Sequence, residues 1–560
     1  MVGFFVNGAP QGPAARPARD VTRADVDMFR REFTGGNVLV PGDPAYGQVK
    51  FFNGRFDHIK PAAIIQPTSE AGVLQAIQWA QRNGVRFAIK GGGHHYEGHS
   101  KIPGAVIDLS KLKMDLANQR LEVDPVTKAS LITVGAGNVL GELYDALATP
   151  DGRKNRVVPA GTSKGVGVIG HAMGGGLADL TPQLGYTAQN LEQVRLVTYS
   201  GKILDINDRG ISEIRDGKPM PYTGNVTGAE VMIALRGGGQ ALAGIVTQAK
   251  LKTHDMNQYD MRYFSHQPAN NLSKEGMIKL ATAWQNWQTA NPEMAKSVSS
   301  KLNMGRSGNE YFFDISGVIA TKDPAQVEAI RRSMSEFTSL MGAVKTEFSS
   351  KPQNMWQIFQ KYKDTDELTE NKKRNSHIVR STIIPDKIPD KNPQNAMRYL
   401  IENMTSGGRN PVTIYAAGGA TLDGIHKTSL PPAKLLVEME TIGGNQQTLD
   451  NYHRGFMQAA GAQYVYANYP GNGKTATDPD LIKKIRDEFS PPAPQRIAHS
   501  PLADGIVVHA RQTTHTVTTQ RTFAVSTHIP QPAATQKPDA PAGQITDPAA
   551  GEPSKWKFKF

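Results

Sequence analysis

Residues 86–100, RFAIKGGGHHYEGHS, hold the residue types of this chain best suited to chemistry. Gly91, Gly92 and Gly93 carry no β-carbons, so the backbone N–H groups of a turn that they form can close on an anionic group such as a pyrophosphate. His94 follows directly and places an imidazole nitrogen at the edge of that turn. The loop is not a Walker loop, because no Gly-Lys-Ser/Thr follows, and it is not a GxGxxG that opens a helix. The pattern favours a phosphate-binding loop with a tethered cofactor. The alternative is a glycine-rich hairpin turn with two surface histidines.

Two further glycine-rich tracts follow in the sequence. One is PAGTSKGVGVIGHAMGGGLADLTPQLG at residues 159–185, and the other is ALRGGGQALAGIVTQ at residues 234–248. Glycine costs roughly 0.5–1 kcal/mol relative to alanine within a regular element. The three clusters therefore predict three places where the backbone approaches another group closely.

The segment that leads into the first loop has the pattern of an α/β unit. Residues 62–65 and 86–89 predict short strands, and residues 69–83 between them predict a helix that stops at Gly84. The apolar face of this helix consists of Val73, Leu74, Ile77 and Ala80. Strand, helix, strand and glycine loop in this order present a ligand at the end of a strand.

The rest of the chain divides by pattern into further elements. Strands are predicted at 105–109, 129–134, 310–319, 411–417 and 434–441, and helices at 139–148, 274–290, 325–341 and 446–460. The elements after residue 255 have the pattern of a separate α+β lobe. Residues 1–50, rich in Gly, Pro and Arg, are expected to be a lead-in arm. The end of the chain is expected to hold a strand pair at 505–527 and a flexible segment at 531–552.

Composition limits what the protein can be. The 560 residues are too many for one ordinary core, so two or more lobes are expected. The chain has no cysteine, which excludes disulfides, thiolate catalysis and thiolate metal sites. No apolar run reaches about 18 residues, and the first residues lack both a charged start and a secretory apolar stretch. We therefore expect a cytoplasmic protein with no membrane partner.

The net charge of +12 would suit nucleic acid or an acidic substrate. However, the densest basic run, at residues 372–374, is only three residues long, and no helix-turn-helix, zinc-finger or RNA-binding pattern accompanies it. A solvated basic surface and no nucleic-acid partner are expected.

Two carboxylates fall on one face of the strand predicted at 434–441. With a period of two residues, Glu438 and Glu440 share a face with Leu436. Carboxylates are costly to bury without partners. Either this face is solvated, or it lines a polar site in which one of the two pKa values is raised.

Four strings, in their order and spacing, resemble the flavin-linked oxidases of the vanillyl-alcohol oxidase type, specifically the berberine bridge enzyme-like branch. They are IKGGGHHYEGHS, VVPAGTSKGVGVIGHAMGGGLADLTPQLGYTAQNLEQVRLVTYSGKIL, ALRGGGQALAGIVT and YVYANYP. The resemblance implies an α+β, two-lobed flavoprotein. It would have a PCMH-type FAD-binding domain of two α/β subdomains, and a substrate domain whose antiparallel sheet, flanked by helices, lies over the isoalloxazine. The expected parts are the FAD-binding domain at 1–255 (core 58–255), the substrate domain at 256–462, a return segment at 463–490 and an atypical extension at 491–560.

The resemblance also implies the cofactor, FAD, and how it is attached. In the family the histidine after the glycines is bonded to the flavin 8α-methyl group. His94 occupies this position, with His95 as the alternative. Many relatives have a second tether through a cysteine, but Ser163 stands at that place, so a single covalent link is expected. Val166 matches a position where valine lets oxygen reach the flavin, which favours an oxidase; ordinary core packing is the alternative.

The family's cofactor segments map onto positions in the glycine tracts and the return segment. His171 among them is either a hydrogen-bonded structural residue or a direct participant. No metal is expected. The residues expected to bind FAD are Lys90, Gly91, Gly92, Gly93, His94, His95, Gly98, His99, Ser100, Gly161, Ser163, Val166, Gly167, Gly170, His171, Gly174, Gly175, Gly244, Val246 and Asn468.

Hydride removal from a substrate also needs a proton acceptor. By resemblance, the strand at 434–441 carries an active-site acid near Glu438, with Glu440 as a second candidate. The tyrosine of the family's Asn-Tyr pair can act as the base, which makes Tyr469 the leading candidate. Its pKa of about 10 would have to be lowered by a cation or by hydrogen bonds. Aromatic packing between the lobes is the alternative for Tyr469.

We therefore expect an FAD-dependent oxidase that takes a hydride from a small organic substrate, with molecular oxygen as acceptor. The substrate could be a sugar hydroxyl, or an alcohol or amine centre of a secondary metabolite. A dehydrogenase or cyclase that does not use oxygen and a non-catalytic flavoprotein are the alternatives. The segment after Lys474, DPDLIKKIRDEFSPPAP, matches the family's closing segment only loosely, which leaves the closure of the FAD-binding lobe open.

Overall fold

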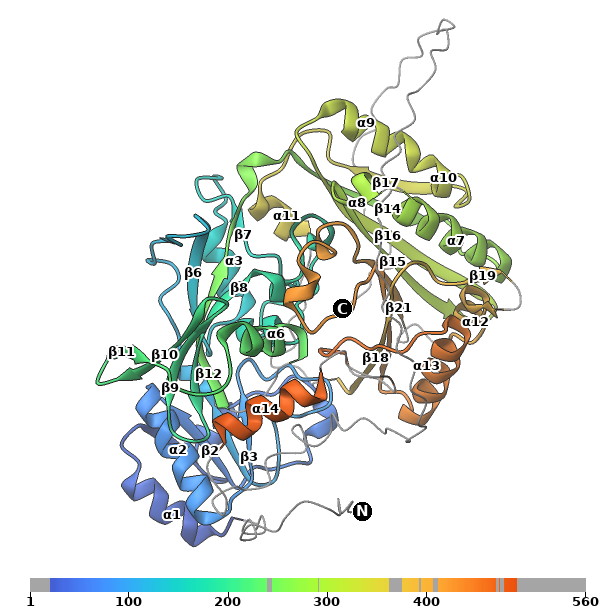
Figure 1. Ribbon diagram of the computed structural model, residues 1–560. Helices are drawn as coiled ribbons and strands as arrows, with labels where there is room; N and C mark the ends of the chain where they lie inside the picture. Colours follow the sequence, from blue (N-terminus) through green and yellow to red (C-terminus); the bar gives the residue numbers. More distant parts are fainter. Residues whose placement is uncertain are drawn as a thin grey trace, which may run out of the picture. The chain divides into compact units, whose positions relative to one another are not determined.

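The computed structural model describes residues 21–490, except for gaps at 239–243, 291, 362–374, 392–393, 406–410, 470–472 and 474–477. The expected strand pair at 505–527 and the extension at 491–560 lie outside the described residues. Within them, three larger sheets and two short strand pairs alternate with helices (Figure 1). The expected α+β class is confirmed.

The first sheet has the strand order β1-β2-β4-β3 and carries the first glycine loop at the end of β3. Strands β2, β4 and β3 run parallel, and β1 pairs antiparallel with β2. Helix α2 connects β2 to β3: its cap Ser69 accepts the N–H of Gly72 at 3.2 Å, and Gly84 ends it at φ +66°. The predicted strand, helix, strand and loop are confirmed. The elements are β1 (Gly36–Leu39), β2 (Ala63–Pro67), α2 (Glu70–Asn83), β3 (Phe87–Lys90) and β4 (Ala105–Asp108).

The prediction of a lead-in arm at residues 1–50 is wrong for residues 21–50, the part that the structure describes. Helix α1 (Arg23–Glu32) is closed by a capping box between Thr22 and Asp25, and β1 joins the first sheet. Phe29 of α1 stacks on Trp79 of α2, with ring centroids 4.5 Å apart. Burial of these apolar side chains outweighs the loop-like composition of the surrounding sequence.

The second sheet is antiparallel, in the order β11-β10-β9-β8-β12-β6-β5. It contains β5 (Glu122–Val123), β6 (Ser130–Gly135), β8 (Leu191–Thr198), β9 (Ile203–Asn207), β10 (Gly210–Arg215), β11 (Lys218–Pro221) and β12 (Gly244–Lys252). The helices in this part of the chain are α3 (Leu140–Leu147), α4 (Val168–Met173), α5 (Thr181–Leu184) and α6 (Gly228–Gly238), and β7 (Arg156–Val157) pairs with β13 (His254–Asp255).

The third sheet is antiparallel, in the order β17-β14-β16-β15-β21-β22-β18. It contains β14 (Met261–Pro268), β15 (Val298–Ser307), β16 (Glu310–Ala320), β17 (Val344–Phe348), β18 (His377–Ile384), β21 (Val412–Ala416) and β22 (Leu435–Ile442). Helices α7, α9, α10, α12 and α13 pack on one face of it, as Figure 1 shows. The elements that accompany the sheet are α7 (Lys274–Ala290), α8 (Pro292–Ala295), α9 (Pro324–Ser333), α10 (Ser335–Thr338), α11 (Met355–Lys361), β19 (Asp390–Lys391), β20 (Gln394–Asn395), α12 (Ala396–Glu402) and α13 (Gln446–Ala460).

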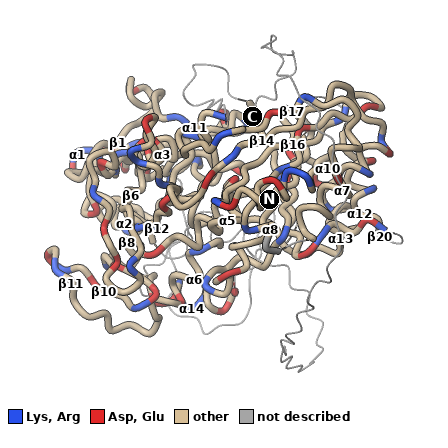
Figure 2. Tube along the Cα trace, turned by 90° about the horizontal axis from the view of Figure 1, so that it is seen from above, with Lys and Arg blue, Asp and Glu red and all other residues tan. Residues whose placement is uncertain are grey.

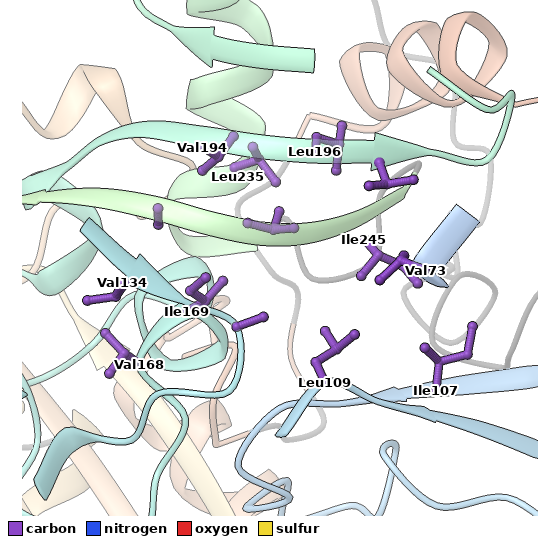
Figure 3. Packing of buried hydrophobic residues seen from close by; sticks show 14 of the residues in the cluster. Val73, Ile107, Leu109, Val134, Val168, Ile169, Val194, Leu196, Leu235 and Ile245 are labelled. Atoms are coloured by element: carbon purple, nitrogen blue, oxygen red, sulfur yellow. The ribbon is translucent and has the colours of Figure 1, made fainter. Parts of the chain in front are cut away.

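Figure 3 shows the hydrophobic packing around helix α4, which lies within the second glycine tract. Side chains from both of the first two sheets and from their helices point toward one another and make one hydrophobic cluster. The labelled residues are Val73, Ile107, Leu109, Val134, Val168, Ile169, Val194, Leu196, Leu235 and Ile245. Val168 and Ile169 bring α4 into this core, so the tract around His171 rests on rigid packing.

The segment after residue 474, which matches the family's closing segment only loosely, packs against the N-terminal half of the chain. Residues Pro479–Phe489 form helix α14, whose Ile485 and Phe489 join the same hydrophobic cluster as Val73 and Val194. The carbonyl of Phe489 accepts the N–H of Ser200 at 2.8 Å. The chain thus returns to its N-terminal half after crossing the third sheet.

Charged residues of both signs are interspersed along the described trace in Figure 2. Among the described residues, no helix combines the length and the apolar character needed to cross a membrane.

The glycine tracts cross where Gly92 meets Gly167. A β-carbon added at Gly92 would lie 2.3 Å from the backbone nitrogen of Gly167, and one added at Gly167 would lie 2.6 Å from the nitrogen of Gly92. The group that these glycines approach is therefore the other glycine loop. By contrast, a β-carbon at Gly170 would meet no protein atom within 4 Å.

We predict that Gly92→Ala destabilises the protein by about 1–3 kcal/mol, because the two backbones must move apart. Gly170→Ala is the matched control. It should leave stability unchanged or raise it by up to about 1 kcal/mol, because alanine favours a helix. Urea unfolding of both variants measures this, and equal stabilities would contradict the crossing.

Candidate active site

His94 lies at the exit of the first glycine loop and stacks on an aromatic ring. Its imidazole lies parallel to Phe52, with centroids 4.7 Å apart and an interplanar angle of 15°. Phe52 also stacks on His377 of β18, with centroids 4.7 Å apart, and meets Tyr96 edge-on at 5.5 Å. Burial, with the charges of Lys90 and His377, lowers the pKa of His94 to about 3. The imidazole is therefore neutral, and a neutral ring nitrogen can act as a nucleophile.

His95 belongs to a different group of side chains. Its Nδ1 accepts the N–H of Glu97 at 3.1 Å, and its ring lies 4.2 Å from that of His99. Burial also lowers the pKa of His95 to about 3. The two consecutive histidines are thus equally neutral but have different contacts.

Lys90, the residue before the first glycine loop, forms a buried ion pair. Its Nζ lies 3.0 Å from Oδ1 of Asp108, and both side chains are buried. Asp108 also accepts hydrogen bonds from Gln66 and from the N–H of Ser110. The ion pair joins β3 to β4, and this structural role accounts for the presence of Lys90.

The second glycine tract holds His171 by a backbone hydrogen bond. The N–H of Gly161 donates to Nε2 of His171 at 3.0 Å. Burial lowers the pKa of His171 to about 4, consistent with a neutral ring that accepts at Nε2. The interpretation of His171 as a hydrogen-bonded structural residue agrees with this geometry.

The return segment packs on the end of this tract. The hydroxyl of Tyr466 accepts the N–H of Leu177 at 2.7 Å, and a β-carbon at Gly175 would lie 2.5 Å from the Tyr466 ring. Asn468 donates to the carbonyl of His171 at 3.1 Å and to the Tyr466 hydroxyl at 3.2 Å. The segment is not a regular strand. Tyr464 is exposed whereas Tyr466, two residues later, is buried.

The third sheet presents the two predicted carboxylates on the face opposite its helices. Glu438 accepts a hydrogen bond from the Tyr415 hydroxyl at 3.1 Å. Glu440 lies 2.7 Å from Nδ1 of His377. Burial and the neighbouring charge of Glu440 raise the pKa of Glu438 to about 8. Of the two alternatives, a solvated face or a polar site with one raised pKa, this geometry matches the second.

Tyr469 lies next to these groups, with ring centroids 5.5 Å from Tyr96 and 5.4 Å from Tyr466. Its backbone carbonyl accepts the Ser381 hydroxyl at 2.5 Å. Burial, and then the charge of Glu438, raise the pKa of Tyr469 well above its usual value. The condition for a tyrosine base, a lowered pKa, is not met among the described residues.

Several other predicted cofactor residues make contacts within the protein. Val246 is in the hydrophobic cluster of β12, and Gly244 packs against Val197 of β8. The remaining positions lie in or beside the two loops. In the first loop, Gly93 and Gly98 have φ of +79° and +67°, and Ser100 is buried. In the second loop, Gly174 is the C-terminal cap of α4. The Ser163 carbonyl accepts the N–H of Val166, and the Val166 carbonyl accepts the N–H of Leu140.

The sequence reasoning missed His377 and the residues around it. Asn53 exchanges two hydrogen bonds with the backbone of His377, at 2.7 and 3.0 Å, and so joins the first loop to β18. The signal was present in HIVRSTII, where a period of two residues places His377 and Ser381 on one face. Phe52 gave no comparable signal, because a phenylalanine in an apolar run is usually core.

Comparisons with known proteins agree with this geometry. A family model described as "FAD binding domain" matches residues 61–207. The chain is 28% identical over 289 residues to berberine bridge enzyme-like Cyn d 4 from Cynodon dactylon, covering 49% of each protein. It is 30% identical over 229 residues to the FAD-linked oxidoreductase hasG from Aspergillus fumigatus, covering 40% of this chain and 43% of that one. These matches therefore span half or less of the curated relatives.

Solved structures share the fold over a larger part of the chain. BBE-like 1 of Physcomitrella patens has a TM-score of 0.63 at 21% identity, covering 80% of this chain and 91% of that one. A chitooligosaccharide oxidase has a TM-score of 0.61 at 17% identity, covering 84% and 100%. The chain contains an FAD-binding domain and is similar to the berberine bridge enzyme-like FAD-linked proteins. The resemblance found in its glycine tracts is confirmed.

The residues of this chain fit FAD at the crossing of its glycine loops. Gly170 leaves open space on α4, where a side chain would meet no protein atom. Nδ1 of His99 is buried without a hydrogen-bond partner among the described residues. With the neutral imidazole of His94, these features provide room, a polar atom and a nucleophile at the two loops.

Proposed function

We propose that the chain is an FAD-dependent oxidase that acts on a small organic substrate and passes electrons to molecular oxygen. The observation that carries the proposal is the grouping of Glu438, Tyr415 and Tyr469 beside the loops of His94 and His171. When bound, FAD supplies the hydride acceptor and the reaction with oxygen that gives hydrogen peroxide. A berberine bridge enzyme variant of similar fold is described in complex with (S)-reticuline, which supports a small-molecule substrate.

In this proposal the N-terminal half, residues 1–255, holds the cofactor, and residues 256–462 hold the substrate. The two glycine loops would receive FAD, and His94 would form the single covalent link to it. The distinct contacts of His94 and His95 support this choice, because only His94 shares the aromatic stack with Phe52 and His377. Ser163 has no thiol and cannot form a second link.

Glu438 is the proposed proton acceptor, in preference to Tyr469. A carboxylate whose pKa is raised toward neutrality is better matched to proton transfer than a phenol whose pKa is raised further. Tyr415 orients Glu438 through its hydroxyl, and Tyr469 would position the substrate as an un-ionised phenol. Glu440 and His377 would act indirectly, through the charge beside Glu438.

We predict that flavin reduction by substrate rises with pH through about 8, because only ionised Glu438 accepts a proton and its folded pKa is about 8. Glu438→Gln should lower the rate by about 10²–10⁴-fold and abolish this pH dependence. Glu440→Gln should move the midpoint to lower pH, because a neighbouring negative charge is removed. Anaerobic stopped-flow absorbance measures all three. An unchanged pH profile in Glu438→Gln would show that another group is the base.

We also predict that denatured protein keeps a fluorescent flavin on the polypeptide and that His94→Ala releases it. His95→Ala is the control and should keep the flavin attached. Fluorescence of the denatured chain in a gel measures the link. Loss of flavin in His95→Ala with retention in His94→Ala would reverse the assignment.

The proposal of an oxidase is tested by mixing reduced protein with oxygenated buffer. Fast reoxidation with one hydrogen peroxide per flavin is expected, and slow reoxidation would favour a dehydrogenase. Val166→Leu should slow reoxidation without changing reduction by substrate, because the larger side chain would obstruct oxygen. Val166→Ala, which is smaller, should not slow it.

A further inference from the structure

The outer edge of strand β18 is covered by a segment from the first half of the chain. Strand β18 is the last strand in the order of the third sheet. Nδ2 of Asn53 donates to the carbonyl of His377 at 2.7 Å, and Oδ1 of Asn53 accepts the N–H of His377 at 3.0 Å. The N–H of Gly54 donates to the carbonyl of Asn375 at 2.8 Å. Residues 52–57, the bridging segment, are thereby fixed to the start of β18.

Arg380 of β18 reaches the first glycine loop from the helix-covered face of the sheet. Arg380 pairs with Met439 of β22, which belongs to the hydrophobic cluster beneath the helices. Paired side chains share a face, so Arg380 lies on the side where Figure 1 shows α13 beside β18. Its guanidinium lies 2.8 Å from Glu97 and 2.6 Å from Asp450 of α13. Because β18 is an edge strand, one arginine can join the helix to the loop.

Glu97 is held by two arginines. Its Oε1 accepts from Nη1 of Arg380 at 2.8 Å, and its Oε2 accepts from Nη1 of Arg55 in the bridging segment at 3.4 Å. Nη2 of Arg55 also donates to the side chain of Gln446 in α13. Gln446 and Asp450 are four residues apart, so they lie on one face of α13. Both arginines therefore connect the loop to the same helix face.

The hydrogen bonds within residues 94–101 shape a turn. Nδ1 of His95 accepts the N–H of Glu97 at 3.1 Å, and the carbonyl of His95 accepts the N–H of Gly98 at 3.1 Å. A bond between residues two or three positions apart moves with the turn, so it does not fix the place of the turn in the molecule. That place depends on longer-range contacts.

Several longer-range contacts of this turn lead to the bridging segment. The N–H of Phe52 donates to the carbonyl of Gly93 at 3.0 Å, and Nδ2 of Asn53 donates to the carbonyl of Tyr96 at 2.7 Å. Glu97 provides the direct connection to β18, through Arg380. By both routes the turn is attached to one place, the outer edge of β18.

Stability alone does not account for this network. Arg380 is 5% exposed, and the cost of removing its charge from water offsets much of the attraction to its carboxylate partners. A guanidinium with two carboxylate partners instead fixes direction, because its N–H groups form a planar fork. Glu97 is three positions after His94. The contact that fixes Glu97 therefore also limits where the His94 imidazole can lie.

We propose that Glu97 is a positioning residue for the attachment of flavin to His94 and that it acts through Arg380. Arg380 lies 283 positions after Glu97, so the turn reaches its working position only when β18 has packed beside the first half of the chain. Attachment at His94 is thereby confined to chains whose third sheet has folded. The attachment rests on the proposed function; the fixing of the turn by Glu97 does not.

Attachment needs an accurately placed imidazole, because a covalent bond forms at one ring nitrogen. The new bond joins that nitrogen to the flavin 8α carbon, while the imidazole N–H and one C–H of the methyl group are broken. The two hydrogen atoms, with their two electrons, end on molecular oxygen as hydrogen peroxide. A reacting group misplaced by about 1 Å can react roughly a hundredfold more slowly.

Glu97→Ala and Asp450→Ala form a matched pair for the test. Each leaves Arg380 with one of these two carboxylates, but only Glu97→Ala releases the turn. Protein is purified at intervals after its synthesis is induced, and the flavin that stays on the denatured chain is divided by the total flavin of the native sample. Glu97→Ala should slow attachment about tenfold or more at unchanged total flavin, whereas Asp450→Ala should match the unmodified protein.

Arg380→Met keeps the apolar part of the side chain and removes its charge. It should slow attachment as much as Glu97→Ala does, and the double variant should be no slower than either, because both changes break one ion pair. Additive slowing in the double variant would show that Glu97 does not act through Arg380.

Hydrogen exchange gives a measurement that does not depend on flavin chemistry. Amides of residues 91–101 should exchange about tenfold faster in Glu97→Ala than in Asp450→Ala, because the turn opens more often. Amides of α7 should exchange equally in both variants, which shows that the third sheet and its helices are folded. If Glu97→Ala does not fold, Glu97→Gln replaces it, since it keeps the size of the side chain and removes the charge.

The outcomes separate this inference from the proposed function. Attachment at the original rate in Glu97→Ala, or equal slowing in Asp450→Ala, overturns the positioning role. Unmodified protein that binds FAD without a covalent link overturns the link to His94. In that case faster exchange at residues 91–101 in Glu97→Ala supports the fixing of the turn, and unchanged exchange overturns it too.

Discussion

The crossing of two glycine loops at Gly92 and Gly167 is the constraint on which the rest of the site depends. With no side chain on either residue, the two backbones approach within distances that a β-carbon would prevent. One loop continues directly into His94, and the other continues into α4 and His171. The positions of both imidazoles therefore follow from one contact between backbones. The hydrophobic packing of Val168 and Ile169 keeps the second loop in place beneath the first.

The third sheet depends on a different constraint, the asymmetry of its two faces. Helices cover its apolar side, and the polar side carries Glu438, Glu440, Asn303 and Asp314. Arg380 of β18 links this sheet to the end of the first loop through an ion pair of 2.8 Å to Glu97, and to helix α13 through one of 2.6 Å to Asp450. Buried ion pairs of this kind add little net stability, because desolvation offsets attraction. Their value lies in fixing which groups meet.

Local patterns predicted the elements well where one face of each element is apolar. The helices α7 and α13 begin and end at the predicted residues, and β22 carries Glu438 and Glu440 on one face as its alternation required. Errors occurred where composition hid the packing. Helix α1 lies in a segment whose composition predicts an arm, and the helix expected at 325–341 is divided into α9 and α10.

The sequence by itself determined the glycine loops, the neighbouring histidines, the absence of a cysteine tether and the pair of carboxylates, because each depends on residue type and short spacing. Only the tertiary structure decided what these residues contact. It separated His94 from His95, paired Glu440 with His377, and placed Asn303 and Asp314 in one row with Glu438. Some of these partners lie more than 100 positions apart in the chain. Their meeting depends on strand register and burial, which no local pattern of residues encodes.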